Sequence, residues 1–143
     1  PTLGRVGAVT HDRHGPPVAG GQAPMTLDMV SRWTPTHAEF AEFARITGDD
    51  NPIHLDDGVY AIGGFPRPVA PGMLLYARLW AMLREARPMA RPELHMLVFP
   101  NPCYAGEEVR LEVRQEADGA PIVLRAVRAI DDSELMIGEL EVQ

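Results

Sequence analysis

Residues 47–57, TGDDNPIHLDD, contain side chains that can carry out acid–base chemistry. Asp49 and His54 lie five residues apart, and Pro52 between them excludes regular helical geometry. Because the segment is bent, both side chains can turn toward one point, whereas a straight strand would send them to opposite faces. A carboxylate and an imidazole that hold one water can take a proton from it and deliver another proton to carbon. The pair therefore has the minimum equipment for adding water across a double bond or removing it.

This chemistry also needs a hydrogen-bond donor for the oxyanion that forms as a thioester carbonyl becomes enolate-like. The first N–H groups of a helix have no partners within the helix, so the start of the apolar segment 72–86 is a candidate. Pro71 has no N–H, which makes Gly72 the first residue there that is able to donate one.

The acidic segment also has a plainer interpretation. The letters DDNP describe an ordinary turn, and His54 can be a hydrogen-bonded structural histidine. Asp50, Asp56 and Asp57 are expected to be solvated loop residues or helix caps. Spacing alone leaves the catalytic and the structural interpretation of Asp49 and His54 open.

Other reaction classes lack their sequence signals. Neither serine lies in a G-x-S-x-G elbow, and there is no G-x-G-x-x-G or G-K-[ST] loop for a nucleotide. All 13 basic residues are arginine, which excludes lysine chemistry. Cys103 is the only cysteine, so a disulfide within the chain is excluded, and we expect a buried side chain rather than a nucleophile. Three residues near the N-terminus have side chains that can bind a metal: His11, Asp12 and His14. Because they lie in a Gly/Pro-rich segment, we expect them to be exposed polar residues instead.

The element before the acidic segment is predicted to be a helix. Thr36 followed by Glu39 has the form of a capping box, and Pro35 stands at the entrance. Gly48 stands where helices commonly end. The positions that share one buried face are Phe40, Phe43, Ala44 and Thr47.

The rest of the chain predicts an α+β domain. Residues 72–86, GMLLYARLWAMLREA, form a helix that is apolar almost all round and should be buried on most sides. Alternating or apolar runs predict strands at 25–33, 93–100, 106–117, 121–130 and 134–143. Asp118-Gly119 is a hairpin signal. We expect one curled antiparallel sheet wrapped around the apolar helix, in a single domain of residues 25–143 preceded by a Gly/Pro-rich lead-in, residues 1–24.

The composition limits the partners. The chain has 143 residues, of which 45% are hydrophobic and 23% charged, as in an ordinary folded domain. A net charge of −7 argues against nucleic acid or an anionic membrane as a partner. No stretch has the length of a membrane span and the first thirty residues lack a signal-peptide core, so we expect a cytoplasmic protein.

Two blocks of the sequence resemble a known family. FARITGDDNPIHLDDGVYA, residues 43–61, resembles the signature of MaoC-like (R)-specific enoyl-CoA hydratases, aromatic-x-x-x-[ST]-G-D-x-N-P-[LIV]-H with a small residue beyond. GGFPRPVAPGMLL is similar to the family's second block, G-F-x-R-P-I-x-H-G-M-L. The resemblance extends from about residue 22 to the C-terminus and is most specific over residues 43–75.

The resemblance implies a hot-dog fold and a homodimer whose active sites lie near the subunit interface. It places the family's catalytic pair on Asp49 and His54, its site-shaping asparagine on Asn51 and its backbone oxyanion donor on Gly72. The implied reaction is syn addition of water to a trans-2-enoyl thioester, giving an (R)-3-hydroxyacyl thioester, or the reverse. Neither a cofactor nor a metal is implied, and the thioester is carried by CoA or by an acyl carrier protein.

The sequence departs from the family's pattern at two positions. Pro71 replaces a usual histidine, and Trp80 stands where many relatives carry a small polar residue. Trp80 either narrows the acyl tunnel or is an ordinary core residue, and we expect both Trp80 and Tyr60 to be core residues. The changes at Pro71 and Trp80 bear on the identity of the substrate more than on the class of reaction. Two alternatives stay open: a non-catalytic hot-dog subunit or acyl-binding partner of a heteromeric dehydratase, and a thioesterase of the same architecture.

Overall fold

The structure, a computed structural model, describes residues 25–55 and 58–143. The predicted lead-in, residues 1–24, lies outside the described residues, as do Asp56 and Asp57. The candidate metal ligands also lie outside: His11, Asp12 and His14. Within the described part of the chain, no helix is long and apolar enough to cross a membrane.

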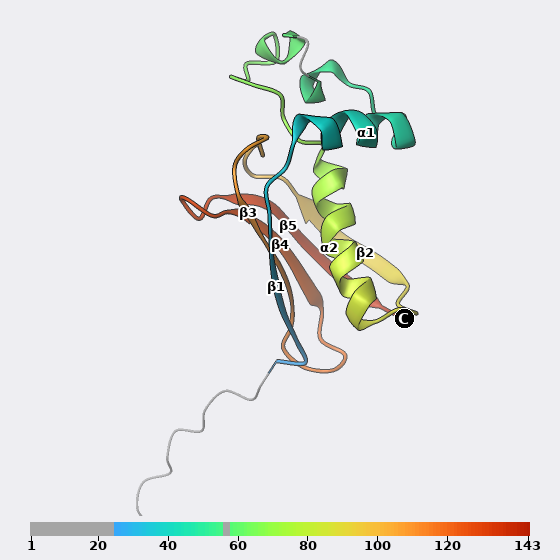
Figure 1. The fold of residues 1–143 in the computed structure, drawn as a ribbon. Helices are drawn as coiled ribbons and strands as arrows, with labels where there is room; N and C mark the ends of the chain where they lie inside the picture. The colour runs from blue at the N-terminus through green and yellow to red at the C-terminus, as the bar shows by residue number, and fades with distance from the viewer. Residues whose placement is uncertain (1–24, 56–57) are drawn as a thin grey trace, which may run out of the picture.

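Five strands form one antiparallel sheet (Figure 1). In the order in which they lie side by side, they are β1 (Leu27–Trp33), β3 (Val109–Gln115), β4 (Ile122–Arg128), β5 (Glu134–Val142) and β2 (Pro92–Val98). Every neighbouring pair is antiparallel. Gly119, with φ of 81°, lies in the predicted β3–β4 hairpin, where a left-handed conformation suits glycine. Because β1 and β2 come first and last in the strand order, they are the two edges of the sheet.

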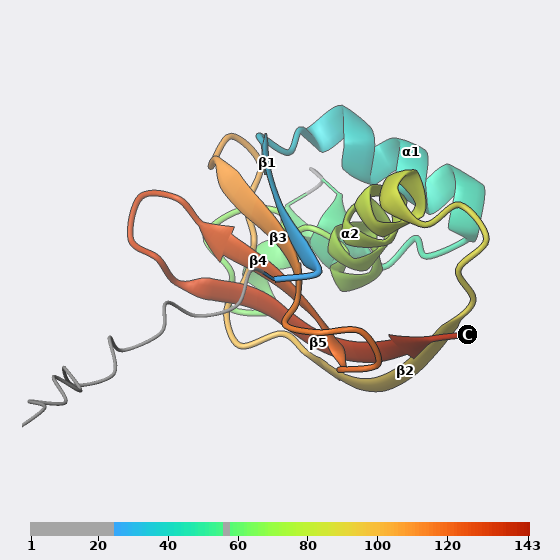
Figure 2. The same cartoon turned by 90° about the horizontal axis from the view of Figure 1, so that it is seen from below.

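Helix α2 (Gly72–Ala86) lies against one face of the sheet, which curls around it (Figure 2). Leu75, Leu79 and Leu83 are buried at helical spacing and form the helix side of the core. The strand residues packed with them are Val109, Leu111, Val113, Ile122, Leu124, Ala126, Leu135, Met136 and Leu140. The predicted α+β fold, an antiparallel sheet wrapped around an apolar helix, is confirmed.

The expectation that α2 is buried on most sides is wrong for the single chain. Only one stripe of the helix is buried, because the sheet covers one side of it. Met73 remains 47% exposed, and Leu74, Tyr76 and Trp80 are only partly buried. The remaining apolar surface of α2 has no cover among the described residues.

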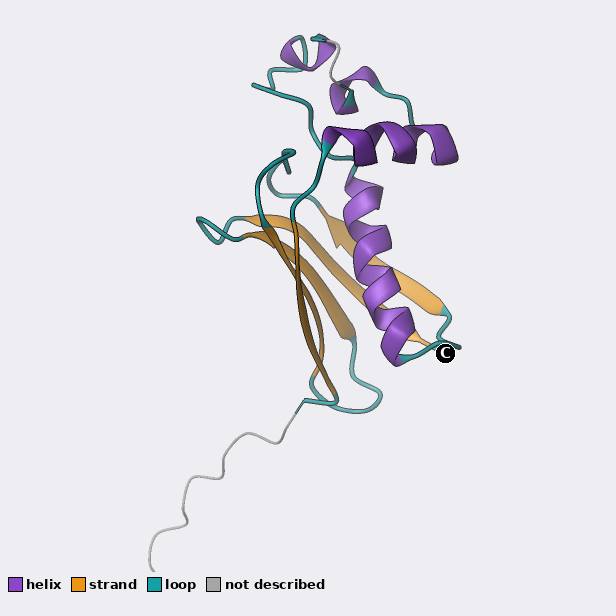
Figure 3. Ribbon diagram, viewed as in Figure 1, coloured by secondary structure: helices purple, strands orange, loops and turns teal. Residues whose placement is uncertain are grey.

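Helix α1 (His37–Thr47) lies across the end of the molecule where α2 begins (Figure 3). Thr36 caps it, because the Thr36 hydroxyl oxygen accepts a hydrogen bond from the N–H of Glu39 at 3.2 Å. Of the predicted buried face, Phe40 and Ala44 are buried, whereas Thr47 is exposed. The hydroxyl of Thr47 donates to a backbone carbonyl of the last turn instead of entering the core.

The predicted capping box is half formed. The Glu39 carboxylate does not return to the helix start; it accepts from the indole N–H of Trp33 at 2.9 Å and from Arg78 at 3.3 Å. The Arg78 guanidinium also lies over the Trp33 ring, 4.4 Å from its centroid. Glu39 therefore ties α1 to β1 and α2, and so holds in place the helix from which the acidic segment emerges.

Candidate active site

The end of α1 fixes the direction in which Asp49 leaves the helix. Gly48 adopts a left-handed conformation, with φ of 77°, and its N–H donates to the carbonyl of Ala44 at 2.9 Å. The N–H of Asp49 donates to the Thr47 hydroxyl oxygen at 3.2 Å. These contacts use only the backbone of Gly48 and Asp49, and the Asp49 side chain is 45% exposed.

A single turn of 3₁₀ helix, η1 (Pro52–His54), carries the histidine. The side-chain oxygen of Asn51 accepts from the N–H of Ile53 at 3.2 Å, and the Asn51 carbonyl accepts from the N–H of His54 at 3.0 Å. Asn51 therefore caps the turn that presents the imidazole.

The ring of His54 is held by a backbone carbonyl. Its Nδ1 lies 2.8 Å from the carbonyl oxygen of Val69, in a buried position. A carbonyl oxygen can only accept, so Nδ1 carries the proton, and in the neutral ring Nε2 presents its lone pair. The N–H of Val69 in turn donates to the carbonyl of Ile53 at 2.9 Å, so that the two segments hold one another.

Nε2 of His54 faces Asp49. The distance from Nε2 to Oδ2 of Asp49 is 3.8 Å, which is too long for a direct hydrogen bond. A neutral imidazole Nε2 and a carboxylate oxygen are both acceptors, and one water can donate a hydrogen to each of them. The structure therefore brings the two predicted catalytic side chains together, with the spacing of a shared water.

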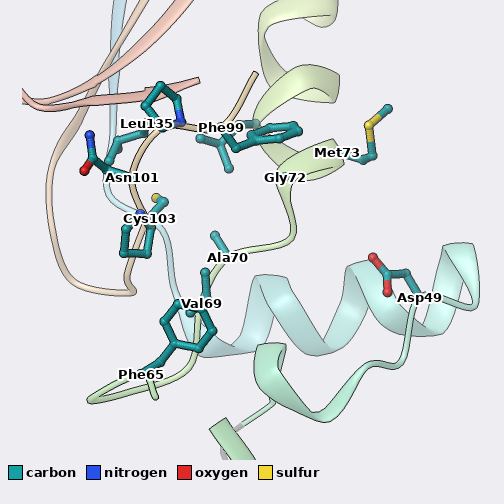
Figure 4. Close-up of a pocket in the computed structure, with 13 residues that line it drawn as sticks. Asp49, Phe65, Val69, Ala70, Gly72, Met73, Phe99, Asn101, Cys103 and Leu135 are labelled. Atoms are coloured by element: carbon teal, nitrogen blue, oxygen red, sulfur yellow. The ribbon is translucent and has the colours of Figure 1, made fainter. Parts of the chain in front are cut away.

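A cavity of about 420 Å³ lies beside Asp49, and His54 is not among the residues that line it (Figure 4). Asp49 and Gly72 both line it, and Figure 4 shows the carboxylate pointing from the loop after α1 toward the start of α2. Most of the remaining wall is apolar, including Phe65, Phe99 and Leu135. Such a cavity suits an apolar group with a polar reacting end at Asp49.

Gly72 is the first residue of α2, and its backbone is closely covered. A Cβ at this position would lie 2.6 Å from Cζ of Phe99, so the ring packs directly on the glycine. Among the described residues, no hydrogen bond uses the N–H of Gly72, whereas the carbonyl of Pro71 accepts from Leu74 at 3.0 Å. The first turn of α2 thus keeps an uncommitted donor at the cavity wall.

Phe99 and the carbonyl of Val69 were not predicted from the sequence as parts of the site. The sequence contains no signal for the Val69 carbonyl, because every residue has one. Phe99 follows the edge strand β2 as an apolar residue that is 44% exposed. Its exposure is a signal of function only once the fold places it against Gly72.

Comparison with known proteins identifies the family. A family model described as a MaoC-like domain matches residues 18–128. The chain belongs to the MaoC-like domain family. The resemblance predicted from the two sequence blocks is therefore confirmed.

Over 83 residues, this MaoC-like chain is 36% identical to the (R)-specific enoyl-CoA hydratase of Aeromonas caviae. That stretch covers 56% of the chain and 61% of the hydratase, which is less than two thirds of the relative. The solved (R)-hydratase from A. caviae involved in PHA biosynthesis gives a TM-score of 0.71 at 27% identity, over 87% of this chain and 98% of that one. The unliganded R-hydratase PhaJ1 from Pseudomonas aeruginosa gives 0.69 at 22% identity, over 84% and 81%. These similarities confirm the predicted hot-dog fold.

Two further residues of this MaoC-like domain bear on its chemistry. Burial raises the pKa of the Cys103 thiol to about 12, with a further contribution from the negative charge of Glu107. The thiol is therefore protonated at neutral pH, which argues against a nucleophile. Trp80 packs against the core beneath Arg84, whose guanidinium lies 5.9 Å from the ring centroid, and it does not line the cavity beside Asp49.

Proposed function

We propose that this MaoC-like domain adds water to trans-2-enoyl thioesters to give (R)-3-hydroxyacyl thioesters, or catalyses the reverse dehydration. The observation that carries the proposal is the pair formed by His54 Nε2 and Asp49 Oδ2, 3.8 Å apart beside an apolar cavity. The (R)-specific enoyl-CoA hydratase activity of the relative from A. caviae supports the same reaction class.

The reaction uses the water that the pair holds. Its oxygen forms a bond to the β-carbon of the enoyl group while one of its protons passes to one member of the pair. That proton is then delivered from the pair to the α-carbon, so that water is added as H and OH and both side chains return to their starting protonation state. Because Asp49 and His54 lie 3.8 Å apart and act through one water, both groups are expected on the same face of the substrate, which is syn addition. With Nδ1 committed to Val69, Nε2 is the ring atom that exchanges the proton.

The thioester oxygen gains negative charge as the carbon–oxygen bond forms. We assign its stabilisation to the N–H of Gly72, the uncommitted donor at the positive end of the α2 dipole. Asn51 is a positioning residue, since its side chain caps the turn that carries His54. Proton transfer and addition of water require neither a redox group nor a metal. The substrate that we propose is an acyl thioester of CoA or of an acyl carrier protein.

We also propose a homodimer that forms along strand β2. This edge strand exposes Leu94, Met96 and Val98, by 42%, 41% and 45% respectively. An exposed apolar edge with free backbone donors and acceptors favours pairing with another strand. Light scattering should report twice the chain mass, and Met96→Lys should shift the protein toward the monomer. A monomer at every concentration would exclude this part of the proposal.

Asp49→Asn and His54→Gln test the catalytic assignment. Loss of an acid–base group should lower the rate of crotonyl-CoA hydration by roughly 10²- to 10⁴-fold, with little change in thermal unfolding. Asp50→Asn is the matched control, because Asp50 is an exposed carboxylate next in the chain and should retain the wild-type rate. Chiral analysis of the product should give the (R)-alcohol.

The alternatives give different results in the same assay. Near-normal hydration by both variants of an active wild type would overturn the assignment of Asp49 and His54. A purified chain that is inactive alone but active with a second subunit would identify the non-catalytic subunit instead. Release of free thiol from an acyl-CoA would identify a thioesterase.

A further inference from the structure

A second connection holds the loop whose Val69 carbonyl contacts His54. On the side away from η1, Val69 pairs with Tyr104 in an isolated antiparallel bridge. The N–H of Ala70 donates to the carbonyl of Cys103 at 2.7 Å. The loop at residues 65–70 therefore lies between the turn that carries His54 and the segment 102–107, of which Pro102 and Cys103 line the cavity.

The carboxylate of Glu107 joins this loop to the sheet. Its Oε1 contacts a terminal nitrogen of Arg67, and its Oε2 lies 2.6 Å from Nε of Arg128 on β4. The Arg67 guanidinium also lies over the ring of Tyr104, 4.8 Å from the centroid. Arg128 in turn donates to the carbonyl of Pro102 at 2.7 Å. One carboxylate thus bridges two arginines, Arg67 in the loop of Val69 and Arg128 in the sheet.

This cluster is partly withdrawn from water. The side chains of Glu107 and Arg128 are 24% and 15% exposed. Oε2 of Glu107 and Nε of Arg128 are fully covered and have no hydrogen-bond partner among the described residues, and they contact one another as an ion pair at 2.6 Å. Arg128 also pairs with Asp131 at 3.1 Å, so its charge keeps a partner if Glu107 is removed. Loss of the Glu107 carboxylate would instead break the ion-pair link between Arg67 and the sheet. The adjacent pair of Glu108 and Arg32 is different, since its side chains are 46% and 62% exposed.

We propose that Glu107 is a positioning residue for the reaction, which acts through Arg67 and the Val69 carbonyl on the imidazole of His54. With the loop held, the carbonyl stays at Nδ1, and the lone pair of Nε2 stays directed at Asp49. With the loop released, the ring can place its proton on Nε2, where no lone pair remains for the water. This inference rests on the proposed function, and the effect that it predicts is on the position of the proton of His54.

Glu107→Gln removes the negative charge of the side chain at nearly constant size, and places a neutral amide against the guanidinium groups of Arg67 and Arg128. We expect kcat to fall roughly tenfold or more, because a small displacement of a catalytic group is costly. The KM should change less than kcat, because no residue that lines the cavity is substituted. Arg67→Met should give the same split, whereas Arg67→Lys keeps a charge on the loop and should recover much of kcat.

Nitrogen NMR of the His54 ring tests the inference without activity. Wild type and the control Glu108→Gln should show one neutral tautomer, with the proton on Nδ1, whereas Glu107→Gln and Arg67→Met should show a mixture. Arg67 is 46% exposed, so Arg67→Met provides the test even if Glu107→Gln does not fold. A folded Arg67→Met with the wild-type tautomer and kcat would overturn the role of this cluster. A wild type that hydrates no enoyl thioester but shows the expected tautomers would overturn the proposed function alone.

Discussion

Gly72→Ala tests whether the contact between α2 and Phe99 sets the geometry of the cavity. The added Cβ would lie 2.6 Å from Cζ and 2.7 Å from Cε1 of Phe99. Carbon atoms in ordinary contact are about 3.5–4.0 Å apart, so the ring must retreat by about 1 Å. Both residues line the cavity, and Gly72 carries the proposed oxyanion donor.

The expected effect on stability is small, since two contributions oppose one another. Overpacking costs about 1 kcal/mol at the low end of its range, because Phe99 is 44% exposed and can move outward. Alanine is favoured over glycine within a helix by up to about 1 kcal/mol. The expected effect on catalysis is larger, because a displacement of about 1 Å at a reacting group lowers the rate by up to roughly 100-fold.

Steady-state hydration of crotonyl-CoA, with thermal unfolding followed by circular dichroism, separates the two effects. Gly72→Ala should lose at least about tenfold in kcat/KM while its unfolding temperature changes by only a few degrees. Adding Phe99→Leu removes the edge of the ring and should restore part of the activity, so the two changes should be strongly non-additive.

Two outcomes would refute this reasoning. A Gly72→Ala variant with wild-type kcat/KM would show that the ring moves aside without consequence for the site. A double variant no more active than Gly72→Ala alone would show that the loss has another origin than the contact with Phe99.

Three further predictions concern stability and reactivity. Thr36→Ala removes the cap of α1 and should lower the free energy of unfolding in urea by about 1 kcal/mol. Glu112→Gln should lower it by about 2 kcal/mol, because three partly exposed arginines lose a carboxylate that is only 4% exposed. Cys103 has a raised pKa of about 12, so its contribution to stability is complete below about pH 8.5 and is lost as the pH rises toward 12. The free energy of unfolding of wild type should therefore fall more steeply than that of Cys103→Ala between about pH 9 and 12, and the native thiol should resist iodoacetamide at neutral pH.

The sequence predicted those features that depend on neighbouring residues. The capping threonine and the left-handed Gly48 determine where α1 begins and ends, and both signals act within a few residues. The bend at Pro52 brings Asp49 and His54 together for the same reason, because the two side chains belong to one short segment.

Contacts between distant segments were not predictable in this way. The acceptor for His54 Nδ1 is a backbone oxygen fifteen residues further along the chain. Every residue has a backbone carbonyl, so the residue type at that position does not indicate the contact. The predicted capping box formed only in part, because the Glu39 carboxylate accepts instead from the indole N–H of Trp33 and the guanidinium of Arg78, which the fold brings next to it. Charged partners at close range are stronger than a second backbone contact at an exposed helix end.

The partial burial of α2 was also not predictable from its composition, and it bears on the assembly. A sheet can cover only one side of a helix, which accounts for the buried stripe of Leu75, Leu79 and Leu83. The apolar residues on its other sides, including Met73, keep exposed surface in the single chain. Phe99, at the end of the exposed edge strand β2, contacts Gly72 at the start of α2, so both apolar surfaces meet at the cavity. A second copy paired along β2, as we propose, would therefore lie beside the cavity, and assembly and completion of the site would be linked.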